Sequence, residues 1–181
     1  MIIVEGPDNS GKSTLVKYLA NKYKLEVLQP LSKGPPSNIE ELYSNTKSLI
    51  LQAIHKGRGC IVDRMPLIGE SIYGPICRER DLWVSYFDHK IRLQKSINTL
   101  EPFYIYCRPT DGMILDMTTH QVKEYDTEEH LNQIKQNKRL ILDAYDNYFV
   151  NFGNHNFFRY DYNNTQHLGQ LNERLKEYLK W

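Results

Sequence analysis

The stretch IIVEGPDNSGKSTL, residues 2–15, decides the fold of this chain. Three apolar residues that favour strands are followed by a glycine-bounded loop, and apolar residues then recur at helical spacing from Lys12 onward. Residues 6–13 match the pattern GxxxxGK followed by Ser or Thr, and they have the strand before and the helix after that this pattern requires. Such a loop binds phosphate, because backbone N–H groups and a helix N-terminus surround the anion.

The residue types of this loop predict how a nucleotide binds. Lys12 would pair with β- and γ-phosphate oxygens, Ser13 would coordinate Mg²⁺, and Thr14 could donate to the α-phosphate. A glycine-rich turn with an exposed lysine is the alternative. The predicted cofactors are therefore ATP and Mg²⁺, and the predicted cofactor-binding residues are Gly6, Asn9, Ser10, Gly11, Lys12, Ser13 and Thr14.

Beyond this stretch, short apolar strands alternate with amphipathic helices. Strands are predicted at residues 25–28, 60–62, 103–107 and 157–160, after a first strand at 2–4. A long helix is predicted to begin at a capping box of Ser37 and Glu40 and to end at Gly57. Further helices are predicted over residues 85–98, after a cap at Asp126 or Thr127, and from Leu168 to Tyr178. This alternation predicts an α/β fold with a mostly parallel sheet covered on both faces.

The carboxyl ends of the predicted strands meet at one edge of the sheet, where ligands bind in such folds. Gly6, Gln29, Asp63 and Arg108 lie at these ends. Asp63 could accept a hydrogen bond from Mg²⁺-bound water or hold Ser13, and the neighbouring guanidinium of Arg64 could bind a phosphate in bidentate fashion. The predicted metal site is Ser13 with Asp63, and a surface ion pair at a strand end is the alternative.

Length and composition exclude several classes of protein. The chain has 181 residues, 40% hydrophobic and 25% charged, which is typical of one globular domain. With 23 Lys and Arg against 22 Asp and Glu, the net charge of +1 gives no overall field that would hold nucleic acid or an anionic membrane. No stretch approaches the roughly 18 apolar residues that a membrane span requires.

The positions of the cysteines and histidines indicate neither a disulfide framework nor a zinc site. Cys60, Cys77 and Cys107 are odd in number, far apart and without a CxxC pair, which fits a reducing compartment and predicts a cytoplasmic location. The six histidines have no metal-ligand spacing.

Residues 4–14, VEGPDNSGKST, resemble the thymidylate kinase and deoxynucleoside kinase branch of the P-loop kinases. The thymidylate kinase form of this motif is EGxDGxGKST, and Asn9 replaces one of its glycines. Asp63-Arg64 and the residues that follow, to Pro75, are similar to the DR motif of that family and the helix after it. This second stretch looks still closer to thymidylate kinase-like proteins of viral genomes.

The resemblance implies an overall organisation and an activity. The fold would be the P-loop kinase fold, a five-stranded sheet in the order 2-3-1-4-5, in a single kinase domain over residues 1–181 with a lid around 109–127. The activity would be ATP- and Mg²⁺-dependent phosphoryl transfer to a deoxynucleoside monophosphate. A homodimer and a viral, phage-type origin are also implied.

The resemblance further implies roles for single residues. Asp8 would contact the 3′-hydroxyl of the acceptor sugar, Arg64 would hold the acceptor phosphate, and Tyr73 would line the acceptor base or sugar. Tyr73 is one place from the usual tyrosine, so packing in its helix is the alternative. The predicted substrate-binding residues are Asp8, Gln29, Arg64, Tyr73 and Arg78, and the predicted catalytic residues are Lys12, Asp63, Arg64 and Arg108.

Gln29-Pro30 departs from the nucleoside kinases, which carry Glu-Pro there with the Glu as general base. A sugar hydroxyl must lose a proton to attack phosphorus, whereas an acceptor phosphate is already largely ionised near neutral pH. Gln29 therefore favours a monophosphate acceptor. A cap on the strand end by Gln29 and a base role for Asp63 are the alternatives.

The predicted lid also differs from that of related kinases, which place arginines there to neutralise the transferred phosphoryl group. Residues 111–124 contain Lys123 and no arginine. Arg108, Arg78 or Arg80 could supply the charge from elsewhere, or each could be a solvated surface residue. By the same resemblance, the loop at 161–166 would close over adenine, with a simple polar turn as the alternative.

Three other functions stay open from the sequence. The acceptor could be an unphosphorylated deoxynucleoside. It could also be a hydroxyl on a polynucleotide or modified base, for which Lys33, Arg78, Arg80 and Lys90 would form a local basic patch. Finally, the lid without arginine would suit a nucleotide-binding regulator that has lost catalysis.

Overall fold

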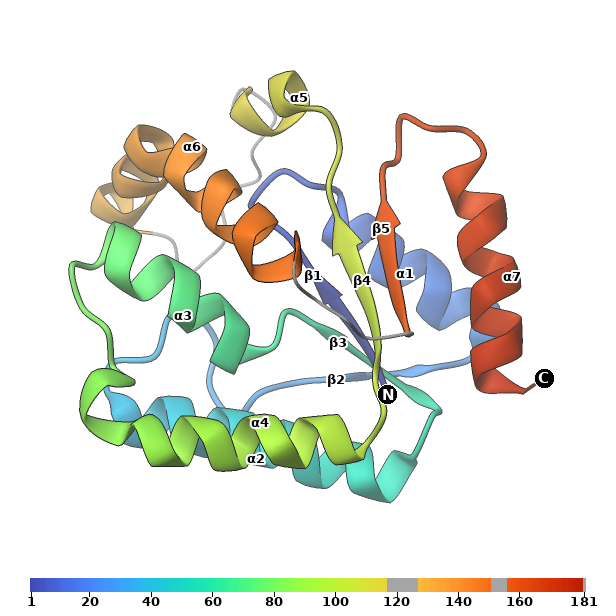
Figure 1. Cartoon of the computed structure of the whole chain (residues 1–181), viewed down its shortest axis with the longest axis horizontal. Coiled ribbons are helices and arrows are strands. Elements are labelled where there is room, and N and C mark those ends of the chain that lie inside the picture. The colour runs from blue at the N-terminus through green and yellow to red at the C-terminus, as the bar shows by residue number, and fades with distance from the viewer. Residues whose placement is uncertain (117–126, 151–155, 181) are drawn as a thin grey trace.

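Five parallel strands form one sheet at the centre of the molecule (Figure 1). The computed structural model describes residues 1–116, 127–150 and 156–180. The sheet order is β2-β3-β1-β4-β5, as the resemblance implied. The strands are β1 (Ile2–Glu5), β2 (Glu26–Leu28), β3 (Cys60–Asp63), β4 (Phe103–Cys107) and β5 (Phe157–Tyr160), and each predicted range is confirmed to within one residue.

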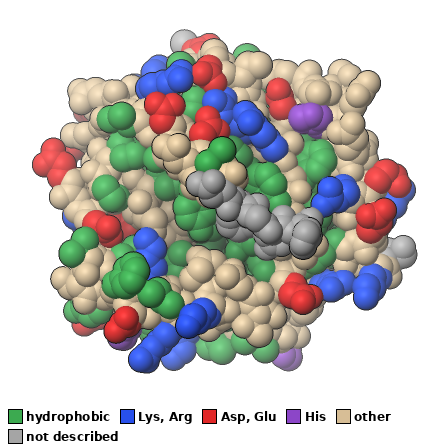
Figure 2. All heavy atoms as spheres, viewed as in Figure 1, with side chains coloured by type: hydrophobic (Ala, Val, Ile, Leu, Met, Phe, Trp, Pro, Cys, Tyr) green, Lys and Arg blue, Asp and Glu red, His purple; other side chains and the backbone are tan. Residues whose placement is uncertain are grey.

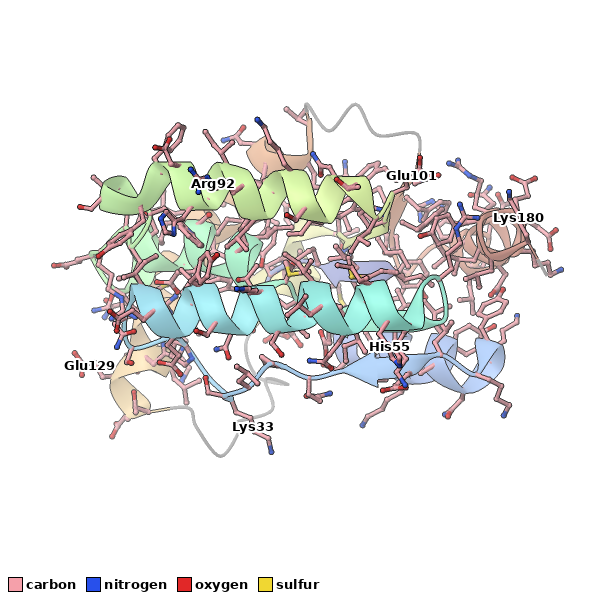
Figure 3. All side chains as sticks on the ribbon, turned by 90° about the horizontal axis from the view of Figure 1, so that it is seen from below. Lys33, His55, Arg92, Glu101, Glu129 and Lys180 are labelled. Atoms are coloured by element: carbon pink, nitrogen blue, oxygen red, sulfur yellow. The ribbon has the colours of Figure 1, made fainter. Side chains whose placement is uncertain are left out.

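Helices cover both faces of this sheet, so the predicted α/β fold is confirmed. Figure 1 shows α1 and α7 on one side and the other long helices on the opposite side. Figure 3 shows α2 and α4 running side by side along the lower surface. The helices are α1 (Lys12–Tyr23), α2 (Ile39–Lys56), α3 (Pro66–Cys77), α4 (Phe87–Thr99), α5 (Asp111–Leu115), α6 (Glu128–Val150) and α7 (His167–Leu179).

The alternation of side chains along β1 divides the core into two layers. Ile2 and Val4 pack with Leu19 of α1 and Leu171 of α7. Ile3 belongs to the other layer, which contains apolar side chains of α2, α3, α4 and α6. Every residue of β1 and β4 is buried, as expected for central strands of a parallel sheet that has helices on both faces.

The ends of the helices correct two details of the sequence prediction. Helix α2 is capped by Asn38, whose side chain accepts from the Glu41 N–H at 2.9 Å, while Glu41 accepts from the Ser37 N–H at 2.6 Å. The predicted box of Ser37 with Glu40 is therefore wrong by one residue, because Asn is an equally good cap and the helix starts one position later. Gly57 ends α2 as predicted, with φ 61.

Helix α6 begins after Thr127, whose hydroxyl accepts from the His130 N–H at 3.1 Å, and Asp126 lies outside the described residues. Helix α4 starts at Phe87 rather than residue 85, because Val84–Tyr86 form a 3₁₀ turn. Helix α5 was not predicted, and α3 was expected only from the resemblance.

The surface carries mixed charge. Over the face drawn in Figure 2, acidic and basic side chains of the described residues are interspersed, in line with a net charge of +1. Cys60, Cys77 and Cys107 are buried free thiols. Among the helices in the described ranges, none is both long and apolar enough to cross a membrane.

Candidate active site

The loop between β1 and α1 has the backbone that its glycines predict. Gly6 has φ 146, Asn9 has φ 63 and Gly11 has φ 79. A Cβ on Gly6 would lie 2.5 Å from the carbonyl oxygen of Cys107 in β4, so no larger residue fits there without a shift of backbone. The loop is thereby pressed against the end of the neighbouring strand, and it leads directly into the N-terminus of α1.

Lys12 folds back over this loop. Its Nζ donates to the Pro7 carbonyl at 2.6 Å and lies 3.4 Å from the Ser10 hydroxyl. Burial, and then the nearby charge of Arg64, lower the pKa of Lys12 to about 8. The ammonium therefore remains mostly charged at neutral pH, at the place where a bound anion would balance it.

Ser13 and Asp63 are brought together as predicted. The Ser13 hydroxyl donates to the Asp63 carboxylate at 2.9 Å, across the gap between α1 and the end of β3. Both are hard oxygen ligands, and Mg²⁺ is usually held by one or two such side chains together with phosphate and water. The pair therefore fits Mg²⁺, and the described residues contain no larger cluster of metal-ligating side chains.

A second cluster lies beside the loop and joins Asp8, Arg64 and Tyr73. The Tyr73 hydroxyl donates to Asp8 Oδ2 at 2.8 Å, and Arg64 Nη2 lies 3.3 Å from Asp8 Oδ1. The Arg64 guanidinium stacks over the Tyr73 ring at 4.9 Å from its centre. Within the described ranges, the buried Nε of Arg64 has no hydrogen-bond partner. This buried donor is therefore unsatisfied within the described residues.

The same cluster opens onto a small cavity between the loop and α6. Four apolar side chains and Lys138 complete its wall beside Asp8 and Tyr73, so it offers one cation, one carboxylate and a hydroxyl in a mainly apolar surrounding. The lining residues are Pro7, Asp8, Tyr73, Ile114, Ile134, Lys138 and Ile141. Helical spacing predicts that Ile134 and Ile141 face inward, but it does not place them at the site, because only the folded chain brings that helix to the loop.

Glu5, the last residue of β1, is fully buried beneath these two clusters. Its carboxylate accepts from the Met65 N–H at 2.5 Å and from the Tyr145 hydroxyl at 3.4 Å. Burial raises the pKa of Glu5 to about 7, and Arg64 partly offsets that rise. Glu5 was not among the predicted site residues, although an acidic residue at the end of an apolar strand is a signal that could have identified it.

We predict that Glu5→Gln flattens the dependence of stability on pH. The folded pKa of about 7 lies above the ordinary 4.5, so the stability present below pH 4.5 is lost as pH rises through 7. For one group this amounts to about 3 kcal/mol. Lys12, with a pKa of about 8, also titrates toward the upper end of this range, but it is present in both proteins and its contribution cancels in their difference. Urea unfolding of both proteins between pH 5 and 8 measures the difference, and a gap that stays constant with pH would contradict the prediction.

Arg108 at the end of β4 is bound by two carboxylates. Its Nε and Nη2 donate to Asp146 of α6 at 2.9 and 2.8 Å, and Nη2 lies 2.7 Å from Asp111. Asp111 also pairs with Arg139 at 2.8 Å. Arg108 thus lies at the predicted edge of the sheet and ties the start of α5 to α6. To reach a phosphoryl group, it would have to exchange the carboxylate of Asp111.

Arg78 directly follows the last residue of α3 and contacts a buried carboxylate of that helix. Its Nη2 pairs with Glu70, whose side chain is only 1% exposed, and Arg80 Nε lies 3.6 Å from the same carboxylate. Arg80 also donates to the Ser37 carbonyl at 3.1 Å. Two arginines of the suggested basic patch are therefore bound to Glu70, while Lys33 points into solvent (Figure 3).

The remaining predicted residues lie around the loop. Asn9 Nδ2 donates to the carbonyls of Met113 and Asp116 at 3.0 and 2.6 Å, so it ties the loop to α5. Thr14 is exposed and Ser10 is buried. Gln29 is exposed, and its carbonyl accepts from Gln52 at 3.1 Å. Of the predicted lid, residues 117–126, with Lys123, lie outside the described residues.

The loop after β5 reaches the phosphate loop through Tyr162. A Cβ on Gly11 would lie 2.9 Å from the Tyr162 ring, so the ring packs directly on this glycine. The Asp161 N–H donates to His167 Nδ1 at 3.0 Å and braces the loop against α7. Tyr162 remains 37% exposed, so one side of the ring is open to a ligand. The loop was predicted at the site, but a role for the Tyr162 ring was not.

Comparison with solved structures defines the fold class as the P-loop kinase fold. YorR from Bacillus subtilis, solved in complex with phosphorylated GDP, is 20% identical, with a TM-score of 0.68 over 97% of this chain and 95% of that one. Deoxyadenosine kinase from M. mycoides with bound dCTP is 18% identical, with a TM-score of 0.53 over 98% of this chain and 100% of that one. The structure of the same enzyme with bound dATP is 18% identical, with a TM-score of 0.51 over 97% of this chain and 98% of that one.

No family model and no curated protein sequence matches the chain. The similarity to solved structures thus confirms the fold class that the resemblance implied. The homodimer, the viral origin and the extent of the kinase domain stay predictions.

Proposed function

We propose that this chain transfers a phosphoryl group from ATP to a deoxynucleoside monophosphate, with Mg²⁺, as a thymidylate kinase-like enzyme. The observation that carries the proposal is the Arg64 guanidinium, which Asp8 and Tyr73 hold beside the phosphate loop while 26% of the side chain stays exposed. A planar, partly exposed cation at this position is suited to a phosphate monoester.

The donor half of the site is formed by the loop at residues 6–14. Lys12 would bind the β- and γ-phosphates in place of its present contact with the Pro7 carbonyl, and Ser13 with Asp63 would hold Mg²⁺. When bound, Mg²⁺ supplies positive charge that neutralises the donor phosphates. Tyr162 lies over Gly11 with one side open, which supports adenine stacking at the loop after β5.

The acceptor half is formed by Asp8, Arg64 and Tyr73. Asp8 is oriented by the Tyr73 hydroxyl, so its carboxylate can accept from a sugar hydroxyl while Arg64 holds the acceptor phosphate. The cavity beside them is lined by Ile114, Ile134 and other residues and has a volume of about 10 Å³, so its walls would have to move apart to admit a base or sugar. Arg78 would act at the outer end of α3, where Glu70 now holds it.

The proposed reaction forms a bond between an acceptor phosphate oxygen and the γ-phosphorus and breaks the bond to the β–γ bridging oxygen. ADP leaves with the bonding electron pair. The acceptor oxygen is already ionised near neutral pH, so no side chain has to remove a proton. An exposed amide at Gln29, rather than a carboxylate, is consistent with this reaction. Catalysis then rests on alignment and charge neutralisation.

Phosphorylation of an unphosphorylated deoxynucleoside is the second candidate function. Two of the similar structures are complexes of one deoxyadenosine kinase, which favours it. Asp63 would then be the alternative general base, although its carboxylate already accepts from Ser13. A polynucleotide acceptor has less support, because Arg78 and Arg80 of the basic patch are engaged by the buried carboxylate of Glu70.

An acceptor panel tests the proposal. We expect ADP formation with at least one of the four deoxynucleoside monophosphates, and kcat/KM at least about tenfold above that for the matching nucleoside, because Arg64 makes a charge-assisted contact only with the phosphate. Coupled ADP detection and mass spectrometry of the product identify the acceptor. Equal or faster turnover of nucleosides would favour the second candidate, and label on DNA a polynucleotide kinase. Tight ATP binding without any turnover would favour a regulator.

A further inference from the structure

We propose that Glu5 is a positioning residue that holds the backbone turn at Arg64 and thereby aims the Arg64 guanidinium at the acceptor phosphate. The inference rests on the proposed function for the identity of the acceptor. The contacts that carry it belong to β1 and β3 and do not depend on which acceptor is used.

Arg64 lies at the point where β3 leaves the sheet. Val4 and Asp63 are the last paired residues of β1 and β3, and the Arg64 N–H still donates to the Val4 carbonyl at 3.0 Å. The next amide, that of Met65, donates to the Glu5 carboxylate at 2.5 Å. Arg64 is therefore held on both sides, by the backbone of Val4 and by the side chain of Glu5.

Arg64 itself has an unfavourable backbone conformation. Its φ of 71 lies in the left-handed region, which is unfavourable for a residue with a side chain. Contacts on either side must therefore maintain this turn. The bond from Met65 to Glu5 is suited to that role, because both groups are fully buried and an amide that loses its acceptor there has no water to replace it.

The backbone turn at Arg64 sets the direction of its side chain. The Arg64 stem crosses α3 at Gly69, where an added Cβ would lie 3.2 Å from Arg64 Cδ. From there Nη2 reaches the Gly6 carbonyl at 3.2 Å and Asp8 at 3.3 Å. A change in the turn would move the guanidinium away from both partners, and hence away from the acceptor.

The Glu5 carboxylate also lies close to other charged groups of the site and contacts α6. Lys12, Asp63 and Arg64 are the charged groups close to its carboxylate, and Tyr145 of α6 donates to its second oxygen. Tyr145 packs edge-on against Tyr73 at 6.2 Å between ring centres. The carboxylate thus joins α6, β1 and the start of α3 beneath the acceptor cluster.

A double-mutant cycle separates positioning of Arg64 from general support of the fold. We expect Glu5→Ala to raise KM for the acceptor monophosphate about tenfold, the equivalent of leaving one buried amide without its acceptor, and to change KM for ATP less than about twofold. In an Arg64→Ala background, Glu5→Ala should have almost no further effect on the acceptor KM. Additive effects would overturn the proposal. Glu40→Ala, at an exposed site in α2, is the matched control.

Glu5→Gln keeps an acceptor for the Met65 N–H and covers the case in which Glu5→Ala fails to fold. Its acceptor KM should stay within about threefold of wild type, because a neutral acceptor retains part of the hydrogen bond. An acceptor KM raised as far as in Glu5→Ala would overturn the proposal.

NMR keeps failure of this inference distinct from failure of the proposed function. If no monophosphate is phosphorylated, the Nε–H signal of Arg64 still reports its position. It should move in Glu5→Ala relative to wild type, and move less in Glu5→Gln, with the Arg108 signal as internal control. An unmoved Arg64 signal would overturn the inference.

Discussion

Replacing Lys12 with Ala should reduce kcat by about 10³-fold, in the range seen when one preorganised donor to transition-state charge is removed. Lys12 is the buried cation of the phosphate loop, and its ammonium contacts the loop only through the Pro7 carbonyl and Ser10. A developing charge on the transferred phosphoryl group would lose its nearest partner. Steady-state ADP formation with the best acceptor measures the loss, and ATP binding by calorimetry measures affinity.

Lys17→Ala is the matched control for this variant, because Lys17 lies on the same helix and is exposed. We expect its kcat to remain within about twofold of wild type, since surface charges contribute little. If Lys12→Ala retained both ATP affinity and turnover, the loop would not be the donor site and the proposed function would be wrong.

Replacing Arg78 with Met should destabilise the fold by about 3 kcal/mol, at the lower end of the range for breaking a buried ion pair. Glu70 is almost fully buried, and Arg78 makes its hydrogen-bonded ion pair, whereas Arg80 lies farther away at 3.6 Å. The loss would be a large part of the 5–15 kcal/mol by which such domains are stable. Urea unfolding at neutral pH measures it.

Two further variants make this result specific. Glu70→Gln combined with Arg78→Met removes the buried charge as well as its partner, so it should recover most of the lost stability. Arg92→Met, on the exposed surface of α4 (Figure 3), should change stability by less than about 0.5 kcal/mol. A double variant as unstable as Arg78→Met alone would show that the ion pair is not the cause.

Much of the fold follows from local patterns in the sequence. The strand ranges and the loop at residues 6–13 are predictable, because apolar runs, glycines and helical spacing act over short distances. The pairing of Ser13 with Asp63 is predictable for a related reason: in a parallel sheet the carboxyl ends of neighbouring strands share one edge.

What the sequence does not reveal depends on contacts between distant segments. The bond from Met65 to Glu5 spans 60 residues, and the packing of Tyr162 on Gly11 joins the two ends of the chain. Neither leaves a periodic pattern. Arg108 illustrates the same point, because its position at the edge of the sheet is predictable but its pairing with Asp146, from a helix far along the chain, is not.

The left-handed backbone at Arg64 has a consequence for protein engineering. A search for stabilising substitutions would select this position, because glycine adopts φ 71 without the penalty of about 1–2 kcal/mol that a side chain incurs. The same substitution removes the guanidinium beside Asp8. Thermal tolerance and turnover therefore compete at residue 64, and a more heat-resistant version of this protein has to gain its stability elsewhere.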